Sequence, residues 1–224
     1  KIVDLQFSVN LDHPIIISQS PVMGHRSRAL RKTVGCERSG LIFGISGTLD
    51  LSKKAQDIGL KAFAACCEKS SKHLGLLIAG TGQDLGQLKN LVDELGIIDQ
   101  VKFLGWQEPE EMDVFHMSCD VLLHPANYDP FPVVIIEAMS WSIPVIGTST
   151  SGTVEERVVD GINGFAVSPG DFENMSESML RFINSPKLLK SASLAARHTA
   201  EIWPMARSVE VVKSEMSKLI KYSA

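Results

Sequence analysis

Short apolar segments alternate with segments of helical periodicity along most of this chain, and this alternation limits the folds that it can adopt. Each apolar segment ends at Gly, Pro or a small polar residue, as buried strands do. Five strands are predicted, at residues 41–46, 74–80, 101–105, 119–125 and 143–148. Strands that alternate with helices are typical of a parallel sheet covered on both faces. The predicted fold class is therefore α/β, a doubly wound parallel sheet.

Helical segments separate these strands and also fill the end of the chain. The intervening segments with apolar residues at helical spacing are AQDIGLKAFAACCEKSSK, DLGQLKNLVDELG and PEEMDVFHMS. Additional C-terminal helices are predicted at FENMSESMLRFIN, PKLLKSASLAARHTAEI and 203–222. We expect residues 1–40 to be a linker that runs into a short basic helix, residues 41–202 to form the α/β domain, and residues 203–224 to form a last helix.

Composition argues against several classes of function. The net charge is -4, from 22 Lys and Arg against 26 Asp and Glu, so nucleic acid is not expected as the main partner. The four cysteines form no CxxC pair, which favours a reduced, cytosolic compartment. No apolar run reaches the roughly 18 residues that a membrane-spanning helix needs. The first residue is Lys1 rather than Met, and we expect the chain to be a fragment.

The glycine-rich segment AGTGQDLG follows the second predicted strand. A doubly wound sheet binds ligands beyond the carboxyl ends of its strands, and a glycine-rich turn there can cradle a pyrophosphate. The spacing of Gly80, Gly82 and Gly86 has one residue too many for GxGxxG, and no acidic residue ends the next strand. The pattern favours an ordinary tight turn that opens a helix. A nicotinamide-dependent oxidoreductase remains the weaker alternative.

The segment GTLDLSKK follows the first predicted strand and offers a different use of the same geometry. Gly47 ends the strand, and Lys53 and Lys54 fall just before or at the start of the next helix. Side-chain cations and backbone N–H groups could converge there on an anion. Neighbouring lysines on a surface loop are as often simply solvated charge, so this segment alone does not choose between the two interpretations.

The segment HPANYDPFPVVIIEAMSWSIPVIG, residues 124–147, places two carboxylates around an apolar run. Asp129 and Glu137 are eight positions apart. The run VVII suits a buried strand, because β-branched residues fit a pleated sheet. A helix over 131–141 would instead separate the two carboxylates by about 12 Å, the extent of a nucleotide sugar from hexose to ribose. By pattern alone the two interpretations are level.

The helical interpretation predicts a specific ligand site. Pro130 and Pro132 would stand at the helix start, where missing N–H donors cost little. The amides of Phe131, Val133 and Val134 could then face a diphosphate. Glu137 would accept hydrogen bonds from a ribose diol.

This segment resembles the signature of family 4 (group 1) glycosyltransferases. In that family a Pro-x-x-x-Glu-x-Phe-Gly stretch runs into a Glu-Ala-Met helix and a Gly-x-Pro-Val-Ile strand. Further segments match the family in order, namely GTLDLSKKAQDIGLKAF, LLIAGTGQDLGQL, VKFLGW and VEERVVDGINGFAV. IVDLQFS resembles the interdomain hinge, and the segment from Trp203 resembles the final helix. The resemblance covers nearly the whole chain and favours the helix over 131–141.

The resemblance implies the carboxyl-terminal, donor-binding lobe of a GT-B enzyme, separated from its amino-terminal acceptor lobe. It implies that Glu137 binds the ribose, and that Asp129 faces the donor sugar as the catalytic candidate. The diphosphate would be bound by Lys54 with Lys53, in the segment that begins at Gly47 and Thr48. The nucleobase would meet the backbone around Gly105 and Trp106.

The resemblance also implies a reaction. The expected activity is retaining transfer of a hexosyl-type sugar from a UDP or GDP sugar to a saccharide or lipid-linked acceptor that the missing lobe binds. No cofactor is expected, and no metal, since the chain has no Asp-x-Asp pair. This chain alone is expected to be inactive. The full-length protein is expected in the cytoplasm, with at most peripheral contact with the inner face of the membrane.

Three positions depart from the family pattern. Thr48 stands where an arginine for the diphosphate is usual, Asp129 replaces the first glutamate, and Pro132 replaces a glycine whose N–H often contacts the donor. These departures keep open a non-catalytic or degenerate nucleotide-sugar-binding module. For His124, which ends a predicted strand near the site, a structural role is favoured over a catalytic one. His116 has no metal-ligand partners at usable spacing.

Overall fold

The computed structural model describes residues 11–37, 39–202, 213–214 and 216–217. The segment IVDLQFS, which resembles the interdomain hinge, and most of the expected last helix lie outside these residues. None of the described helices combines the length and the apolar character needed to cross a membrane.

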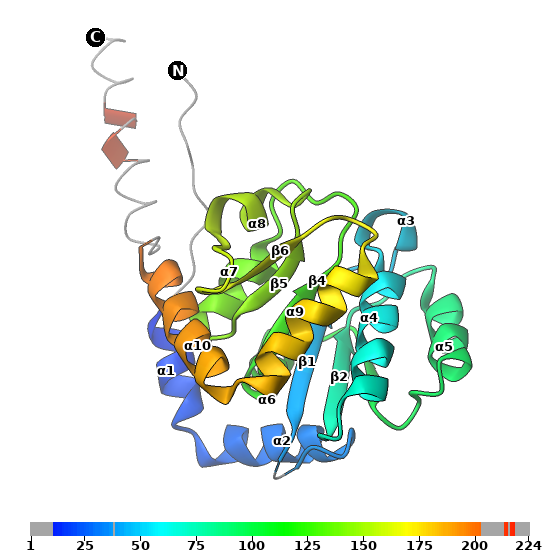
Figure 1. Cartoon of the computed structure of the whole chain (residues 1–224). Helices are drawn as coiled ribbons and strands as arrows, with labels where there is room; N and C mark the ends of the chain where they lie inside the picture. Colours follow the sequence, from blue (N-terminus) through cyan, green and yellow to red (C-terminus); the bar gives the residue numbers. More distant parts are fainter. Residues whose placement is uncertain (1–10, 38, 203–212, 215, 218–224) are drawn as a thin grey trace.

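Six parallel strands form one sheet in the described part of the chain, in the order β3-β2-β1-β4-β5-β6 (Figure 1). Their bounds are β1 Leu41–Ser46, β2 Leu74–Ala79, β3 Val101–Gly105, β4 Val121–His124, β5 Val145–Thr148 and β6 Gly164–Val167. The strand order reverses between β1 and β4, where Phe43 pairs with Val121 and Gly44 with Leu122. The predicted doubly wound parallel sheet is confirmed, and its switch point lies between these two strands.

Helices cover both faces of this sheet. Their bounds are α1 Asp12–Ser18, α2 Pro21–Lys32, α3 Leu51–Lys54, α4 Gln56–Lys69, α5 Leu85–Glu94, α6 Pro109–Ser118, α7 Val133–Ser140, α8 Gly152–Arg157, α9 Phe172–Asn184 and α10 Pro186–Glu201. One core packs Phe43 of β1 against Phe63 of α4 and Phe182 of α9. The opposite core packs Ile42 of β1 against Phe115 of α6. Alternate residues of β1 thus face opposite cores, as the period of a strand requires.

The first described residues add two helices, α1 and α2, to the second core. α2 coincides with the predicted short basic helix and packs against α6. Val34 and Cys36, which follow it, are buried in the same core as Ile42. The boundary at residue 40 stays a prediction, although side chains on both sides of it share this core.

The apolar run VVII forms helix α7, as the resemblance implied. Ile135, Ala138 and Met139 of this helix pack into the core with Val145 of β5. The helix begins at Val133, two residues later than predicted, because a proline disfavours helical geometry in the residue before it. Burial against the sheet outweighs the weak helix propensity of the β-branched residues.

The sixth strand, GFAV, was not predicted. It follows the turn DGIN, and two of its four residues, Gly164 and Ala166, are types that are depleted in strands.

Gly80 and Gly82 of AGTGQDLG are explained by contact with the protein's own β1–α3 turn. A Cβ added at Gly80 would lie 1.9 Å from the Gly47 carbonyl oxygen, and one at Gly82 would lie 2.2 Å from the Leu49 carbonyl oxygen. Gly80 also has a φ of +130°, which side chains rarely adopt. Asp84 reinforces the contact, because its carboxylate accepts a hydrogen bond from the Leu51 amide at 2.8 Å. The turn therefore holds the first strand's loop in place.

Replacing Gly80 by alanine should destabilise the fold by about 2–4 kcal/mol, because the added methyl group meets backbone and the φ is unfavourable. Gly86→Ala is the matched control, since nothing lies within 4 Å of its added Cβ and it lies in α5. That change should be neutral or should stabilise by up to about 1 kcal/mol. Urea unfolding of both variants measures the difference, and equal stabilities would contradict the packing role of Gly80.

Candidate functional site

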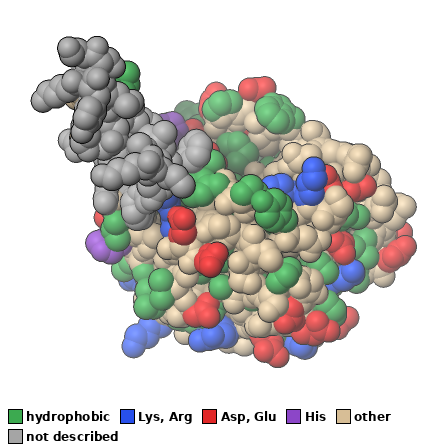
Figure 2. Space-filling view, turned by 90° about the horizontal axis from the view of Figure 1, so that it is seen from above, with side chains coloured by type: hydrophobic (Ala, Val, Ile, Leu, Met, Phe, Trp, Pro, Cys, Tyr) green, Lys and Arg blue, Asp and Glu red, His purple; other side chains and the backbone are tan. Residues whose placement is uncertain are grey.

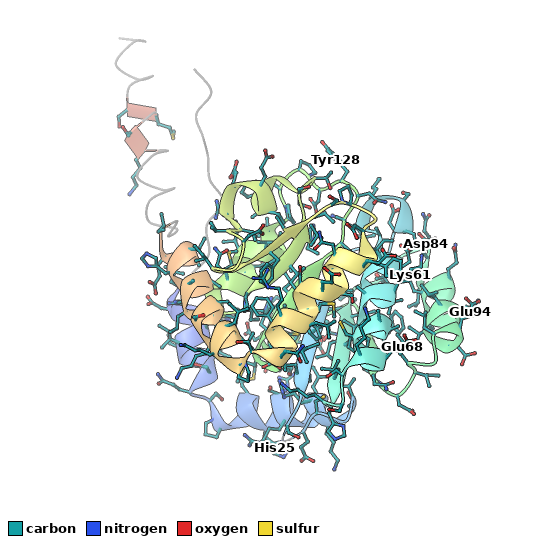
Figure 3. All side chains as sticks on the ribbon, viewed as in Figure 1. His25, Lys61, Glu68, Asp84, Glu94 and Tyr128 are labelled. Carbon is teal, nitrogen blue, oxygen red and sulfur yellow. The ribbon has the colours of Figure 1, made fainter. Side chains whose placement is uncertain are left out.

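The loops that follow the strands meet along one edge of the sheet. This edge lies at the top of Figure 1, where α3 and α8 begin, and Figure 2 looks down on it. Hydrophobic side chains gather near the middle of this face, with Lys, Arg, Asp and Glu side chains beside them (Figure 2). Tyr128, which is 65% exposed, marks the upper rim (Figure 3).

A groove of about 500 Å³ runs between α6 and α7. One wall is formed by Pro109, Met112, Asp113 and His116 of α6, and the other by Val133, Glu137 and Ser140 of α7 with Trp141 at its C-cap. Both sets repeat at helical spacing, so each is one face of its helix. Trp106 and Gln107 lie at one end of the groove, and His13 and Pro14 of α1 at the other. The volume is within the range of small-molecule pockets.

A second cavity of about 310 Å³ lies over the ends of β1 and β2. It is lined by Ser46, Gly47, Thr48, Ala79, Gly80 and Thr81. Trp106, Gln107 and Met112 line both cavities, so the two adjoin. Trp106 is 71% exposed and presents an open aromatic surface at the junction. Together the cavities make an elongated site that runs from the ends of β1 and β2 into the groove between α6 and α7.

Glu137 lies in the wall of the groove, one turn after the start of α7. Its side chain is half-buried, and burial raises the pKa of its carboxyl above the ordinary value of 4.5. A carboxylate in such a place is costly unless it gains hydrogen bonds. A ligand with two adjacent hydroxyl groups would supply them.

Asp129 forms an ion pair with Lys54 of α3. The Lys54 Nζ donates to Asp129 Oδ2, and His124 Nε2 lies 3.4 Å from the same oxygen. The geometry of this second contact does not meet the criteria for a hydrogen bond. Burial would raise the pKa of Asp129, yet the contacts with His124 and Lys54 outweigh it and lower that pKa to about 2. Asp129 is therefore ionised at neutral pH.

Backbone hydrogen bonds fix the turn that carries this ion pair. The Asp50 carboxylate caps α3 by accepting from the amides of Ser52 and Lys53. The carbonyl of Lys53 accepts from the amides of Asn127 and Tyr128, at 2.8 and 3.3 Å. The β1–α3 turn is thereby tied to the β4–α7 loop.

The N-terminus of α7 points toward the same region. Its first turn leaves the amides of Val133 and Val134 without intrahelical acceptors. Pro132 is the N-cap and has no N–H to add. The loop before α7 is held by the start of α8, since the Gly152 amide donates to the Asp129 carbonyl at 3.2 Å. The Arg157 guanidinium lies 5.6 Å from the centre of the Phe131 ring.

The structure brings many of the predicted site residues together. Gly47, Thr48, Trp106, Val133 and Glu137 line the two adjoining cavities. Lys54 and Asp129, predicted to bind diphosphate and sugar, contact each other. The remaining predicted residues, Lys53, Gly105, Phe131 and Val134, are not among the residues that line either cavity. Lys53 is exposed and takes part through its carbonyl, and the Gly105 carbonyl accepts from the Gly80 amide at 2.7 Å.

Several groove residues were not predicted from the sequence. These are His13, Pro14, Gln107, Pro109, Met112, Asp113, His116 and Ser140. Of these residues, only His116 was considered from the sequence, and no role was assigned to it. Polar residues at helical spacing on α6 were the available signal. Among the described residues, no three His, Cys, Asp or Glu side chains are grouped so that they could hold a metal ion.

A doubly wound sheet with a ligand-sized groove at its carboxyl edge defines a Rossmann-like ligand-binding domain. Residues 30–199 match the family model for "Glycosyl transferases group 1". The chain therefore belongs to the group 1 glycosyltransferases. This membership argues against the nicotinamide-dependent oxidoreductase, which was the weaker alternative.

Known proteins of this kind align with most of the chain. A D-inositol 3-phosphate glycosyltransferase from Saccharomonospora viridis is 27% identical over 192 residues, which are 82% of this chain and 44% of that protein. The chain spans less than half the length of the curated relatives it matches first.

Solved structures share the fold. Anabaena HepE in complex with UDP superposes with a TM-score of 0.80 at 21% identity, covering 94% of this chain and 56% of that one. The C-terminal domain of the group 1 family protein LpcC from Francisella tularensis superposes with a TM-score of 0.73 at 19% identity, covering 87% of this chain and 97% of that one.

Replacing Asp129 by asparagine should destabilise the fold at pH 6 by about 1–2 kcal/mol, because Lys54 loses its partner. The folded-state pKa of about 2 lies below the ordinary value of 3.8, so the ionised carboxylate stabilises the fold above about pH 4. That contribution is lost as the pH falls toward 2. The difference between wild type and variant should therefore narrow between pH 6 and pH 3 in urea unfolding.

Asp57→Asn is the matched control for this change. Asp57 and Lys61 form an i,i+4 ion pair within α4 at 3.0 Å, and more of both side chains is exposed than in the pair of Lys54 with Asp129. Such a surface pair contributes about 0.3–0.5 kcal/mol. An equal loss in both variants, or a difference at Asp129 that does not change with pH, would contradict the role assigned to the pair of Lys54 with Asp129.

Proposed function

We propose that this chain is the donor-binding part of a glycosyltransferase that takes a hexosyl-type sugar from a UDP or GDP sugar. The observation that carries the proposal is the position of Glu137, half-buried in a groove that opens at the carboxyl edge of the sheet. It could accept two hydrogen bonds from the ribose hydroxyls. UDP and UDP-glucose in the Anabaena HepE structures are further support for a nucleotide-sugar ligand.

The diphosphate would lie between the ribose and the ion pair of Lys54 with Asp129. The amides of Val133 and Val134 and the positive end of the α7 dipole favour an anion there. Lys54 would share its ammonium group between Asp129 and the diphosphate. The cavity at Gly47 and Thr48 adjoins this space, and the Thr48 carbonyl is held by Gln56 Nε2 at 2.7 Å. Thr48 would offer a hydroxyl in place of a charged group.

The proposed reaction is retaining and needs neither a metal nor a protein nucleophile. The bond between the sugar C1 and the diphosphate oxygen breaks, and the acceptor oxygen bonds to C1 on the same face. The acceptor's proton passes to the departing diphosphate. Lys54 and the α7 N-terminus would stabilise the charge of the leaving group. Asp129, ionised and close by, would stabilise the positive charge that develops on the sugar.

The acceptor would be a saccharide or a lipid-linked molecule bound by a second lobe. That this chain spans 97% of the LpcC C-terminal domain supports its treatment as one lobe of a larger enzyme. A non-catalytic nucleotide-sugar-binding module is the second candidate. Thr48 and Pro132 favour it, because each removes a donor that the diphosphate could use.

Replacing Glu137 by glutamine should weaken the binding of a nucleotide sugar by about ten- to a hundredfold, because it removes charge-assisted hydrogen bonds worth about 1.5–3 kcal/mol. Calorimetry with UDP-glucose and GDP-mannose measures the loss. In the wild type, affinity should also fall on acidification through the raised pKa of Glu137. The variant should lack that dependence.

The same substitution should not harm the fold. Because the folded-state pKa of Glu137 is raised, its ionisation opposes folding at neutral pH, and Glu137→Gln should be at least as stable as wild type there. Glu155→Gln, an exposed change on α8 at the same edge, is the control and should keep full affinity. Unchanged affinity in Glu137→Gln would remove this residue from the site.

The 224-residue chain should bind a nucleotide sugar but form no glycoside with sugar or lipid acceptors. Positioning of the acceptor can account for about 7–11 kcal/mol of a barrier, and the lobe that would supply it is separate. The chain joined to that lobe should gain transfer activity, measured by product formation. Binding without any gain would favour the non-catalytic module, and robust transfer by the chain alone would show that the domain boundary is misplaced.

A further inference from the structure

The turn between β3 and α6 carries a side chain that the proposed chemistry does not use. Gln107 lines both the groove and the adjoining cavity, so it lies where the two meet. This place is opposite the inner end of the groove, which His13 and Pro14 of α1 form. A ligand that fills the groove as far as this turn would contact Gln107.

Two hydrogen bonds fix how the Gln107 carboxamide is turned. Its Nε2 donates to the Leu104 carbonyl at 3.0 Å and to the Trp106 carbonyl at 2.9 Å. Both partners are carbonyl oxygens, which only accept hydrogen bonds, so the NH2 end of the carboxamide faces them. The two N–H groups of Nε2 are thereby used within the turn. The Oε1 atom is the part of the carboxamide that remains for a ligand.

Gln107 Oε1 is an acceptor that a ligand can reach. It accepts no hydrogen bond from the described residues. Gln107 is half-buried, yet this oxygen is not one of the buried polar atoms that lack a partner, so it is accessible to solvent. An amide oxygen carries lone pairs and no proton, so it pairs only with an N–H or O–H group of a ligand.

The neighbouring Trp106 offers the same ligand a flat surface. Its side chain lines both cavities and is largely exposed. The indole Nε1 donates to Glu108 Oε1 at 3.1 Å, which holds the ring and uses its one N–H group. The indole can therefore offer a ligand only its apolar ring surface, on which a planar heterocycle can stack.

A flat surface beside an accessible acceptor suits the base of a nucleotide. The proposed function places the ribose at Glu137, which lines the same groove as Trp106 and Gln107. A base attached to that ribose would lie in the groove, with its face toward the Trp106 indole and its edge toward Gln107 Oε1. The acceptor would then read whether that edge carries a proton.

We infer that Gln107 is a specificity-determining residue, whose Oε1 selects a donor nucleotide with a base that carries a ring N–H group on that edge. Uracil donates there through N3–H, and guanine through N1–H. Cytosine and adenine have an unprotonated ring nitrogen at the corresponding position, so two acceptors would face each other without a proton between them. The inference rests on the proposed function, because it places the ribose at Glu137.

Matched pairs of nucleotides test this selection by calorimetry on the 224-residue chain. UDP carries the ring N–H group that CDP lacks, and IDP carries the one that ADP lacks. The pair with the higher affinity decides the test, and its N–H member should bind about ten- to a hundredfold more tightly than its partner. Methylation of that ring nitrogen should abolish the advantage. These comparisons need no variant, so they stand even if a substitution at the turn fails to fold.

Gln107→Met removes the acceptor and keeps a side chain of similar length. It should weaken the N–H member of the pair at least about tenfold and leave its partner within about twofold, so that the chain no longer distinguishes the two. A role of Gln107 in holding the turn alone would instead weaken both members by the same factor and leave their ratio unchanged.

Gln87→Met is the matched control for this change. Gln87 also donates through its Nε2, to Asp84 Oδ1 at 3.2 Å, but it is exposed on α5 and is not among the residues that line either cavity. This variant should keep both affinities. Glu137→Gln should weaken both members of the pair by the same factor, which separates the ribose contact from the base contact.

Equal binding of the two members to the wild type would overturn this inference and leave the proposed function intact. A ratio that Gln107→Met does not change would likewise overturn it. If none of the four nucleotides binds to the wild type, the proposed function fails and the inference fails with it.

Discussion

The contact between the β1–α3 turn and the β4–α7 loop is the interaction on which the rest of the site depends. The two loops follow strands that are neighbours at the switch point, so they meet although about 75 residues separate them. The Lys53 carbonyl fixes the backbone of the β4–α7 loop, and Lys54 holds its carboxylate. These contacts set the position of Asp129 and the start of α7 relative to Gly47 and Thr48.

The sequence predicted the sheet well, because its strands are apolar runs with clear ends. It left α7 undecided, because the β-branched run VVII suits a buried strand as well as it suits the helix over 131–141. Only the resemblance to a family favoured the helix. The strand at Gly164 was missed because two of its four residues, Gly164 and Ala166, have low β propensity. The inner end of the groove could not be predicted either. It depends on His13 and Asp113, which are 100 positions apart and meet only in the folded chain.

The groove also carries polar groups whose burial does not stabilise the fold. Glu137 and His116 both lie on the helix faces that line the groove, and burial disfavours the charged form of each. In the unliganded fold these groups reduce stability rather than add to it. Asp129 differs, because Lys54 and His124 compensate its burial. A carboxylate with protein partners is already satisfied, whereas one without them is free to bind a ligand.

This distinction bears on the three departures from the family pattern. Thr48 and Pro132 remove donors for a diphosphate, but the amides of Val133 and Val134 and the Lys54 ammonium remain at the same edge. The Lys54 ammonium is paired with Asp129. It would bind a diphosphate only by sharing its charge between Asp129 and that ligand. Under the proposed function, diphosphate affinity would therefore depend on how readily Lys54 can be shared with Asp129. The shorter side chain at position 129 would then matter as much for the leaving group as for the sugar.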